Sequence, residues 1–142
     1  AVAEARFGDP ASEAFLAQAI ADRRLRILQT FLPKVNPVVG PAIDDQGHLT
    51  FRNMAVDMAV ADRAPGYRAL WYTFDNLTDR ATLIETTEET QSPFLMPAMP
   101  RSEYIKVDIL AVGGPEAWTR PISVYFRRNG GGWALVGLER LP

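Results

Sequence analysis

The sequence predicts a mainly β protein, an antiparallel β-sandwich of about seven strands preceded by one N-terminal α-helix. Two observations support this prediction. Between residues 15 and 32 apolar residues recur every three or four positions, which is the period of an amphipathic helix. After residue 41 the period changes to two, and turn-forming residues interrupt the pattern at regular intervals. Short strands with no helix between them favour two sheets packed face to face.

The helix is expected to begin at Asp9-Pro10, because Asp9 can cap its first amides and Pro10 suits its first turn. Pro33 ends it. We expect its apolar stripe to pack on the chain's own sheet, and the alternative is that it docks on another domain or chain. The stripe consists of Phe15, Leu16, Ala19, Ile20, the stem of Arg23, Ile27, Leu28, Phe31 and Leu32.

Residues 34–41 are rich in proline and cannot be helical, so they form a linker or an edge segment. We therefore divide the chain into an N-terminal amphipathic helix with a Pro-rich linker, residues 1–41, and a β-sandwich domain, residues 42–142. The predicted strands are residues 49–51, 55–61, 67–74, 82–87, 104–112, 122–128 and 133–138.

One strand shows the two-residue period most clearly. Ile105, Val107, Ile109 and Ala111 alternate with residues that are mostly polar, which assigns these four to the core. Asn129-Gly130-Gly131-Gly132 follows as a hairpin turn, since asparagine and glycine tolerate the positive φ that such turns require.

The Trp71 strand, followed by the Tyr104-x-Lys106-x-Asp108 strand, resembles the immunoglobulin and fibronectin type III pattern over about residues 49–140. In those families a core tryptophan on a middle strand packs against a later strand that carries tyrosine. The alternative architecture is an α+β cone similar to the nuclear transport factor 2 superfamily, where N-terminal helices pack into a curved sheet. That fold usually needs about three helices, and the sequence offers one.

Composition limits the possible functions. With a formal net charge of −2, the chain lacks the basic field that drives nucleic-acid binding. The absence of cysteine excludes disulfides and thiolate metal sites, and no apolar run is long enough to span a membrane. The start Ala1-Val2-Ala3 and the lack of cysteine favour an exported or periplasmic bacterial protein.

No catalytic residue, cofactor or metal site is predicted. His48 is the only histidine, and it follows a turn glycine, where an exposed hairpin histidine is expected. None of the serines lies in a nucleophile elbow. Acid pairs such as Asp44-Asp45 fall in turns, where aspartate is favoured for local hydrogen bonds. The methionines, Met54, Met58, Met96 and Met99, raise a copper hypothesis but are more typical of core packing.

Four residues are the candidate binding residues. Trp118 lies in the turn-rich loop 113–121, where it forms a binding platform for a sugar ring or a partner, or else folds back over the core. Tyr72 and Tyr125 join the platform only if strand register places them side by side. Arg127 belongs to a set of arginines that forms a local anion site or else protects strand edges: Arg101, Arg120, Arg127, Arg128 and Arg140.

These observations lead us to expect a non-catalytic accessory or interaction domain whose partner is a protein or a neighbouring domain. The first alternative is a carbohydrate-binding module that uses the loop aromatics to bind glycan. The second is a small α+β enzyme or ligand-binding domain, with a pocket between the N-terminal helix and the sheet.

Overall fold

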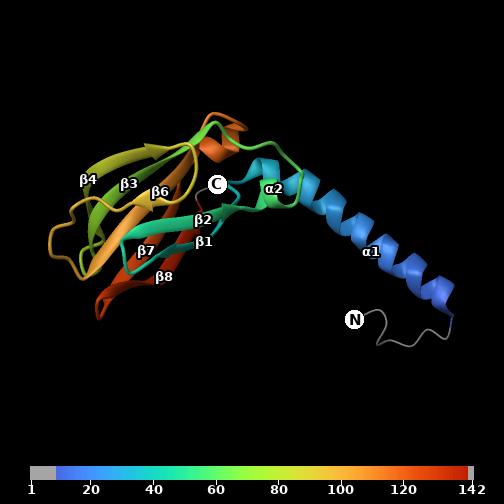
Figure 1. Cartoon of the computed structure of the whole chain (residues 1–142), viewed down its shortest axis with the longest axis horizontal. Helices are drawn as coiled ribbons and strands as arrows, with labels where there is room; N and C mark the ends of the chain where they lie inside the picture. Colours follow the sequence, from blue (N-terminus) through green and yellow to red (C-terminus); the bar gives the residue numbers. More distant parts are fainter. Residues whose placement is uncertain (1–8, 141–142) are drawn as a thin grey trace.

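The computed structural model describes residues 9–140, which form a β-sandwich with a long N-terminal helix (Figure 1). The helical elements are α1 (Pro10–Phe31), η2 (Leu32–Lys34), α2 (Met54–Asp57) and η3 (Glu116–Thr119). The strands are β1 (Val38–Ile43), β2 (His48–Asn53), β3 (Gly66–Asp75), β4 (Arg80–Glu89), β5 (Phe94–Leu95), β6 (Tyr104–Val112), β7 (Ile122–Asn129) and β8 (Gly132–Arg140). The segment Ala1-Val2-Ala3, on which the predicted export partly depends, lies outside the described residues.

The strands form two antiparallel sheets. The smaller sheet has the order β1-β2-β5, and the larger has the order β4-β3-β6-β7-β8. Two strands of the larger sheet, β4 and β8, therefore lie at its edges. Figure 1 shows the smaller sheet lying against one face of the larger one. The fold class predicted from the sequence, a mainly β sandwich behind one N-terminal helix, is confirmed.

The core lies between the two sheets. Ile105, Val107, Ile109 and Ala111 are all buried, as their alternation predicts. From the smaller sheet, Val38, Leu49 and Phe94 meet them, together with Trp71 of β3. The alternate residues of β3, β6 and β7 point to the opposite face of the larger sheet, away from the core.

One predicted strand is wrong. Residues 55–61 form no strand, because the Asn53 side chain accepts hydrogen bonds from the amides of Ala55 and Val56 and caps the short helix α2. Ala59 then adopts a φ of 53°, which is incompatible with a strand. The Pro-rich segment is an edge segment, one of the two alternatives predicted for it: from Val38 onward it forms the edge strand β1, which continues past residue 41.

Helix α1 does not pack on the sheet, which corrects our expectation for its apolar stripe. Asp9 caps the helix by accepting hydrogen bonds from the amides of Ala11 and Ser12, as predicted. From there α1 extends away from the sandwich, and none of its residues is buried (Figure 1). The smaller sheet covers the core instead, so the chain does not form the α+β cone considered as an alternative. Within residues 9–140, no helix is both long enough and apolar enough to cross a bilayer.

The chain is fastened to the sandwich just after α1. The Asn36 side chain donates hydrogen bonds to the carbonyl oxygens of Ile109 (3.0 Å) and Arg120 (2.9 Å) and accepts one from the amide of Val38 (3.1 Å). Arg140 of β8 donates to the carbonyl oxygens of Asn36 (3.2 Å) and Val38 (2.7 Å). These contacts join β1 to the edge of the larger sheet.

Candidate functional site

Three of the four candidate binding residues share the outer face of the larger sheet. Tyr72 pairs with Lys106, and Lys106 pairs with Tyr125, so the two tyrosines flank this lysine in one row across β3, β6 and β7. Arg127 lies in the next row, opposite Tyr104. Strand register thus brings Tyr72 and Tyr125 onto one surface. We call this surface the aromatic face, and it consists of Tyr72, Phe74, Tyr104 and Tyr125.

The rings of the aromatic face are engaged with their neighbours. The Nζ atom of Lys106 lies 5.2 Å from the centre of the Tyr72 ring, and the guanidinium of Arg127 lies 5.7 Å from the centre of the Tyr104 ring. Phe74 and Tyr125 meet edge to face, with their ring centres 5.0 Å apart. The surface is therefore a mixed layer of aromatic and cationic groups, which differs from the open ring platform expected for sugar stacking.

A buried carboxylate lies on the other side of the row of Tyr72, Lys106 and Tyr125, away from Arg127. Asp108 is only 8% exposed although it belongs to the outer face. It accepts a hydrogen bond of 2.6 Å from the Ser123 hydroxyl, and Lys106 Nζ lies 3.2 Å from the same oxygen. Burial raises the pKa of Tyr72, and the charge of Asp108 together with a hydrogen bond to it raises that pKa further. Asp108 thus binds two polar groups beside the aromatic face, the Ser123 hydroxyl and the Lys106 ammonium group.

Tyr125 owes its position to a glycine on the neighbouring strand. Gly137 of β8 pairs with Tyr125 of β7. A Cβ atom added at Gly137 would lie 3.3 Å from the Tyr125 ring. The ring therefore lies over bare backbone. Burial raises the pKa of Tyr125, and the negative charge of Glu139 acts in the same direction.

Trp118 does not belong to this surface. It is 0% exposed and packs in the core, where its indole nitrogen donates a 3.2 Å hydrogen bond to the carbonyl oxygen of Leu32. The loop 113–121 folds inward because η3 turns the chain at Glu116, and the Trp118 ring lies 3.5 Å from the Cβ position of Gly114. The fold-back alternative is therefore the one observed, and the predicted Trp118 platform is wrong.

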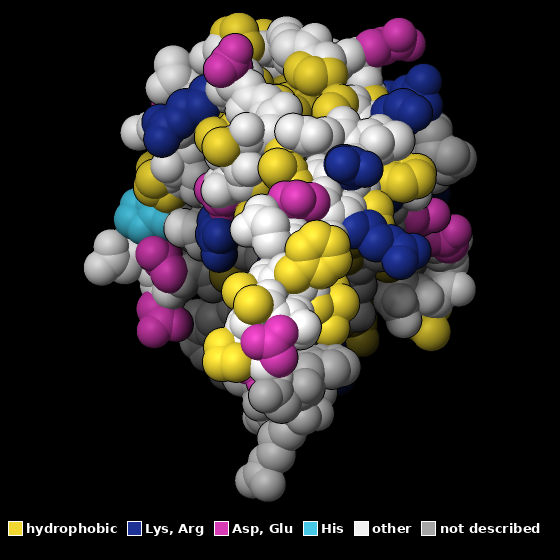
Figure 2. All heavy atoms as spheres, turned by 90° about the vertical axis from the view of Figure 1, so that its right-hand side faces the viewer, with side chains coloured by type: hydrophobic (Ala, Val, Ile, Leu, Met, Phe, Trp, Pro, Cys, Tyr) yellow, Lys and Arg dark blue, Asp and Glu magenta, His cyan; other side chains and the backbone are white. Residues whose placement is uncertain are grey.

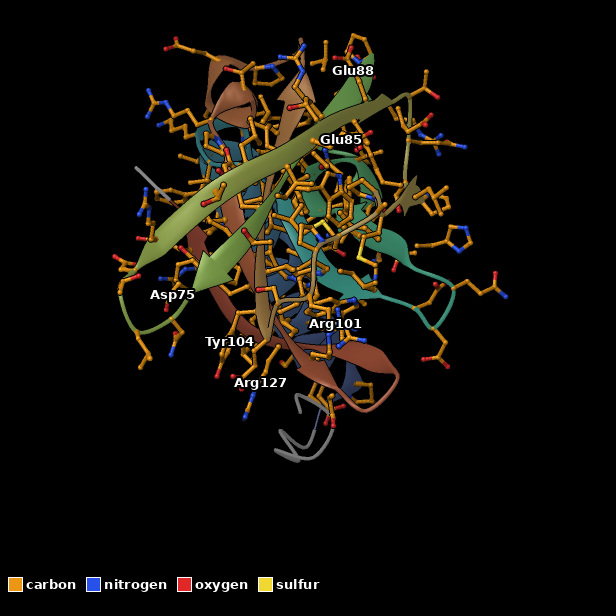
Figure 3. All side chains as sticks on the ribbon, turned by 90° about the vertical axis from the view of Figure 1, so that its left-hand side faces the viewer. Asp75, Glu85, Glu88, Arg101, Tyr104 and Arg127 are labelled. Carbon is orange, nitrogen blue, oxygen red and sulfur yellow. The ribbon has the colours of Figure 1, made fainter. Side chains whose placement is uncertain are left out.

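The five candidate arginines separate into two groups. Arg120 forms an ion pair with Glu116 at 3.8 Å, and Arg140 donates hydrogen bonds to the carbonyl oxygens of Asn36 and Val38. These two arginines are therefore engaged separately from the other three. The other three, Arg101, Arg127 and Arg128, lie around the start of β6 and the end of β7. Figure 3 shows Tyr104 and Arg127 next to each other at this end of the sheet, with Arg101 to their right.

His48 has a structural role in its turn. Asp44 Oδ1 accepts a hydrogen bond from the His48 amide (2.8 Å), and Asp44 Oδ2 lies 3.2 Å from His48 Nδ1. The hydrogen bond from the His48 amide lowers the pKa of Asp44. Among the described residues, no group of three or more histidines and acids is arranged to hold a metal ion.

Helix α1 exposes apolar side chains along its length. We call these residues the apolar arm: Phe15, Ile20, Leu25, Ile27 and Phe31. Phe15 is 77% exposed, which is unusual for a ring that would normally be buried. A shallow groove of about 370 Å³ runs beside the helix, and its lining comes from α1 and Met58 without any strand residue. Figure 2 shows hydrophobic side chains on the face of the molecule from which α1 projects.

A pocket of about 410 Å³ lies at the end of the sandwich formed by α2 and the start of β3. Phe51 and Tyr67 line it, and the Tyr67 hydroxyl accepts a 2.8 Å hydrogen bond from Asn53. Arg63 also lines it. Sequence reasoning missed this pocket, because its walls come from three separate segments and show no common motif.

Sequence reasoning also missed Asn36 and Asp108. The even spacing of Tyr104, Lys106 and Asp108 placed Asp108 on the outer face, but its burial depends on side chains from β3 and β7.

No protein-family model matches the chain, and no significant match is found among curated proteins or solved structures.

Proposed function

We propose that this chain is a non-catalytic interaction domain whose apolar arm docks on a protein partner or on a neighbouring domain of the same protein. The observation that supports this proposal is the exposure of the apolar arm on a helix with no buried residue. Most helices in proteins are stabilised by packing an apolar face against another element. Covering one large apolar side chain contributes about 1.5–3 kcal/mol, so a partner that covers several of these residues gains substantial binding free energy.

The end of α1 supports the same proposal. Trp118 and the half-buried Leu32 hold the C-terminal end of the helix to the sandwich. The 22 residues of α1 span about 33 Å, so the arm presents its side chains well away from the strands. A helix that is already formed and is anchored at one end loses less conformational entropy on binding than an unstructured segment would.

The test compares the full chain with an Ile20→Ser/Ile27→Ser variant and with a matched Gln18→Ser/Gln29→Ser control on the polar side of the helix. Each is used as bait in an extract of the source organism, and its own association is measured by light scattering. We expect one protein to be retained by the wild type and by the control, with a loss of about tenfold or more for the apolar variant. Equal retention by all three baits would contradict the proposal.

Carbohydrate binding is a second proposal, favoured by the row formed by Tyr72, Lys106 and Tyr125. Without Trp118, a glycan would contact tyrosine hydroxyls and cations more than ring faces. A glycan screen with the Tyr72→Ala and Tyr125→Ala variants tests it. A sugar bound at this row should lose its binding in each of the two variants. An exported location and a closer likeness to immunoglobulin or fibronectin type III domains also remain predictions.

A further inference from the structure

Three arginines gather at one end of the larger sheet, although the chain as a whole has a formal net charge of −2. Arg101 precedes β6, and Arg127 and Arg128 lie near the end of β7. A hydrogen bond of 2.8 Å from the Arg128 amide to the Glu103 carbonyl joins the two segments. This pairing brings Arg101 and Arg128 to one groove, whereas Arg127, the preceding residue of β7, projects from the opposite face of the strand beside Tyr104.

One carboxylate accompanies them, and it is already paired. Glu103 Oε1 accepts a hydrogen bond of 3.0 Å from Nε of Arg127, and Nη2 of Arg127 forms an ion pair with the same oxygen at 2.9 Å. Three guanidinium groups less one carboxylate leave two positive charges in excess. The Arg127–Glu103 pair is neutral as a whole, so the excess of positive charge comes from Arg101 and Arg128.

Arg128 is positioned by contacts that leave part of its guanidinium free. The group lies 4.5 Å from the centre of the Trp133 ring, and its Nε donates a 3.2 Å hydrogen bond to the Ser102 carbonyl. Within residues 9–140, the Nη atoms of Arg128 and the whole Arg101 side chain form no hydrogen bond or ion pair. Two sets of guanidinium donors therefore remain available to a ligand.

A groove of about 570 Å³ lies between these residues, lined by Arg101, Ser102, Glu103, Arg128 and Gly130. Its size falls in the range of small-molecule sites. Gly130 has a φ of 61°, and a Cβ atom added there would contact nothing within 4 Å. The hairpin side of the groove is thus open, which leaves room for a body larger than a single ion.

We propose that this groove, which we call the arginine groove, binds a tetrahedral oxyanion, a phosphate or sulfate group carried by a larger molecule. Guanidinium groups donate parallel pairs of hydrogen bonds to such oxyanions, and the Arg127–Glu103 pair sets the local charge. A soluble phosphorylated compound and an anionic lipid headgroup present the same group. The site is independent of the apolar arm, so its failure would leave the proposed function unaffected.

The first test titrates the full ¹⁵N-labelled chain with pyrophosphate and follows its amide resonances. We expect shifts confined to residues 101–104 and 127–132, and a loss of affinity of about tenfold in both Arg101→Gln and Arg128→Gln. The matched control is Arg63→Gln, which removes the same charge at the opposite end of the sandwich. An equal loss in the control, or shifts spread over the whole surface, would show an unspecific charge effect and overturn the site.

Glu103→Gln gives a test of opposite sign. It removes the single acid of the groove and releases Arg127, so pyrophosphate should bind several-fold more tightly. Unchanged or weaker binding would contradict the charge argument. Co-sedimentation with vesicles that contain phosphatidylglycerol then separates the two sources: binding that depends on Arg101 assigns a lipid headgroup, and binding of pyrophosphate alone assigns a soluble ligand. Binding of neither probe would refute the proposal.

Discussion

The indole nitrogen of Trp118 donates a hydrogen bond to the carbonyl oxygen of Leu32 across 3.2 Å. Leu32 follows the last residue of α1, and carbonyl groups at a helix end lack partners within the helix. The bond therefore satisfies one of these carbonyls and fixes the direction in which the helix leaves the sandwich. A residue that the sequence suggested as a binding platform is thus the joint between the two parts of the chain.

Replacing Trp118 with phenylalanine should weaken this joint. Trp118→Phe leaves the Leu32 carbonyl without its partner, so we expect the free energy of unfolding to fall by about 1–3 kcal/mol. Urea unfolding measures the loss, and amide hydrogen exchange at Leu32, which donates to the Leu28 carbonyl, should become faster. If stability and exchange both stayed at wild-type values, the hydrogen bond would have no anchoring role.

Removing most of α1 should leave the sandwich folded. A chain that begins at residue 27 keeps Leu28 and Leu32, and it loses no buried residue, so its free energy of unfolding should change by less than about 1 kcal/mol. A chain that begins at residue 38 lacks Asn36 and serves as the contrast, since it should be strongly destabilised. The amide spectrum of each truncated chain checks the outcome. An unfolded product of the first truncation would show that the arm supports the core.

Asn36 should be among the most sensitive residues. Asn36→Ala leaves two carbonyl oxygens and one amide without their hydrogen bonds in a buried place, and we expect a loss of about 2–4 kcal/mol in the free energy of unfolding. Chemical denaturation measures it. Asn76→Ala, in the exposed turn between β3 and β4, is the matched control and should change stability by less than about 0.5 kcal/mol.

The raised pKa of Tyr72 predicts a dependence on alkaline pH. Because the pKa is higher in the folded state, the neutral phenol contributes stability that is fully present below about pH 10 and is lost as the pH rises through the folded value. Asp108→Asn should lower the pKa of Tyr72 toward its usual range. An absorbance titration of tyrosinate, with Tyr72→Phe identifying the signal, measures the shift. A Tyr72 pKa that rises in Asp108→Asn would disprove the assigned cause.

The sequence predicted those parts of the fold that depend on local pattern. Ile105, Val107 and Ile109 sit in a strand with a dry face and a wetter face, and the two-residue period reports this directly. The same period misled us at residues 55–61, because the Asn53 cap outweighed the apolar alternation. At Val38 the surrounding prolines allowed either a linker or an edge segment, and the structure shows an edge strand.

The candidate site depended on relations between distant segments. Tyr72 and Tyr125 are 53 positions apart, and only the register of β3 and β7 on β6 places them beside Lys106. Asp108 becomes buried through the side chains of neighbouring strands, which a single sequence does not reveal. For Trp118, the sequence allowed both an exposed and a buried position. The structure buries it beside Leu32, which lies 86 positions earlier in the chain and which a local pattern cannot relate to it.

The edge strand β4 exposes several glutamates, among them Glu85, Glu88 and Glu89. Figure 3 shows Glu85 and Glu88 along this strand, at the end away from Arg101. While ionised, these side chains keep a second molecule from extending the sheet through the open backbone of β4. Replacing Glu85 and Glu89 with glutamine removes their share of that repulsion. A Glu85→Gln/Glu89→Gln variant should therefore associate more readily through this strand, independently of any partner.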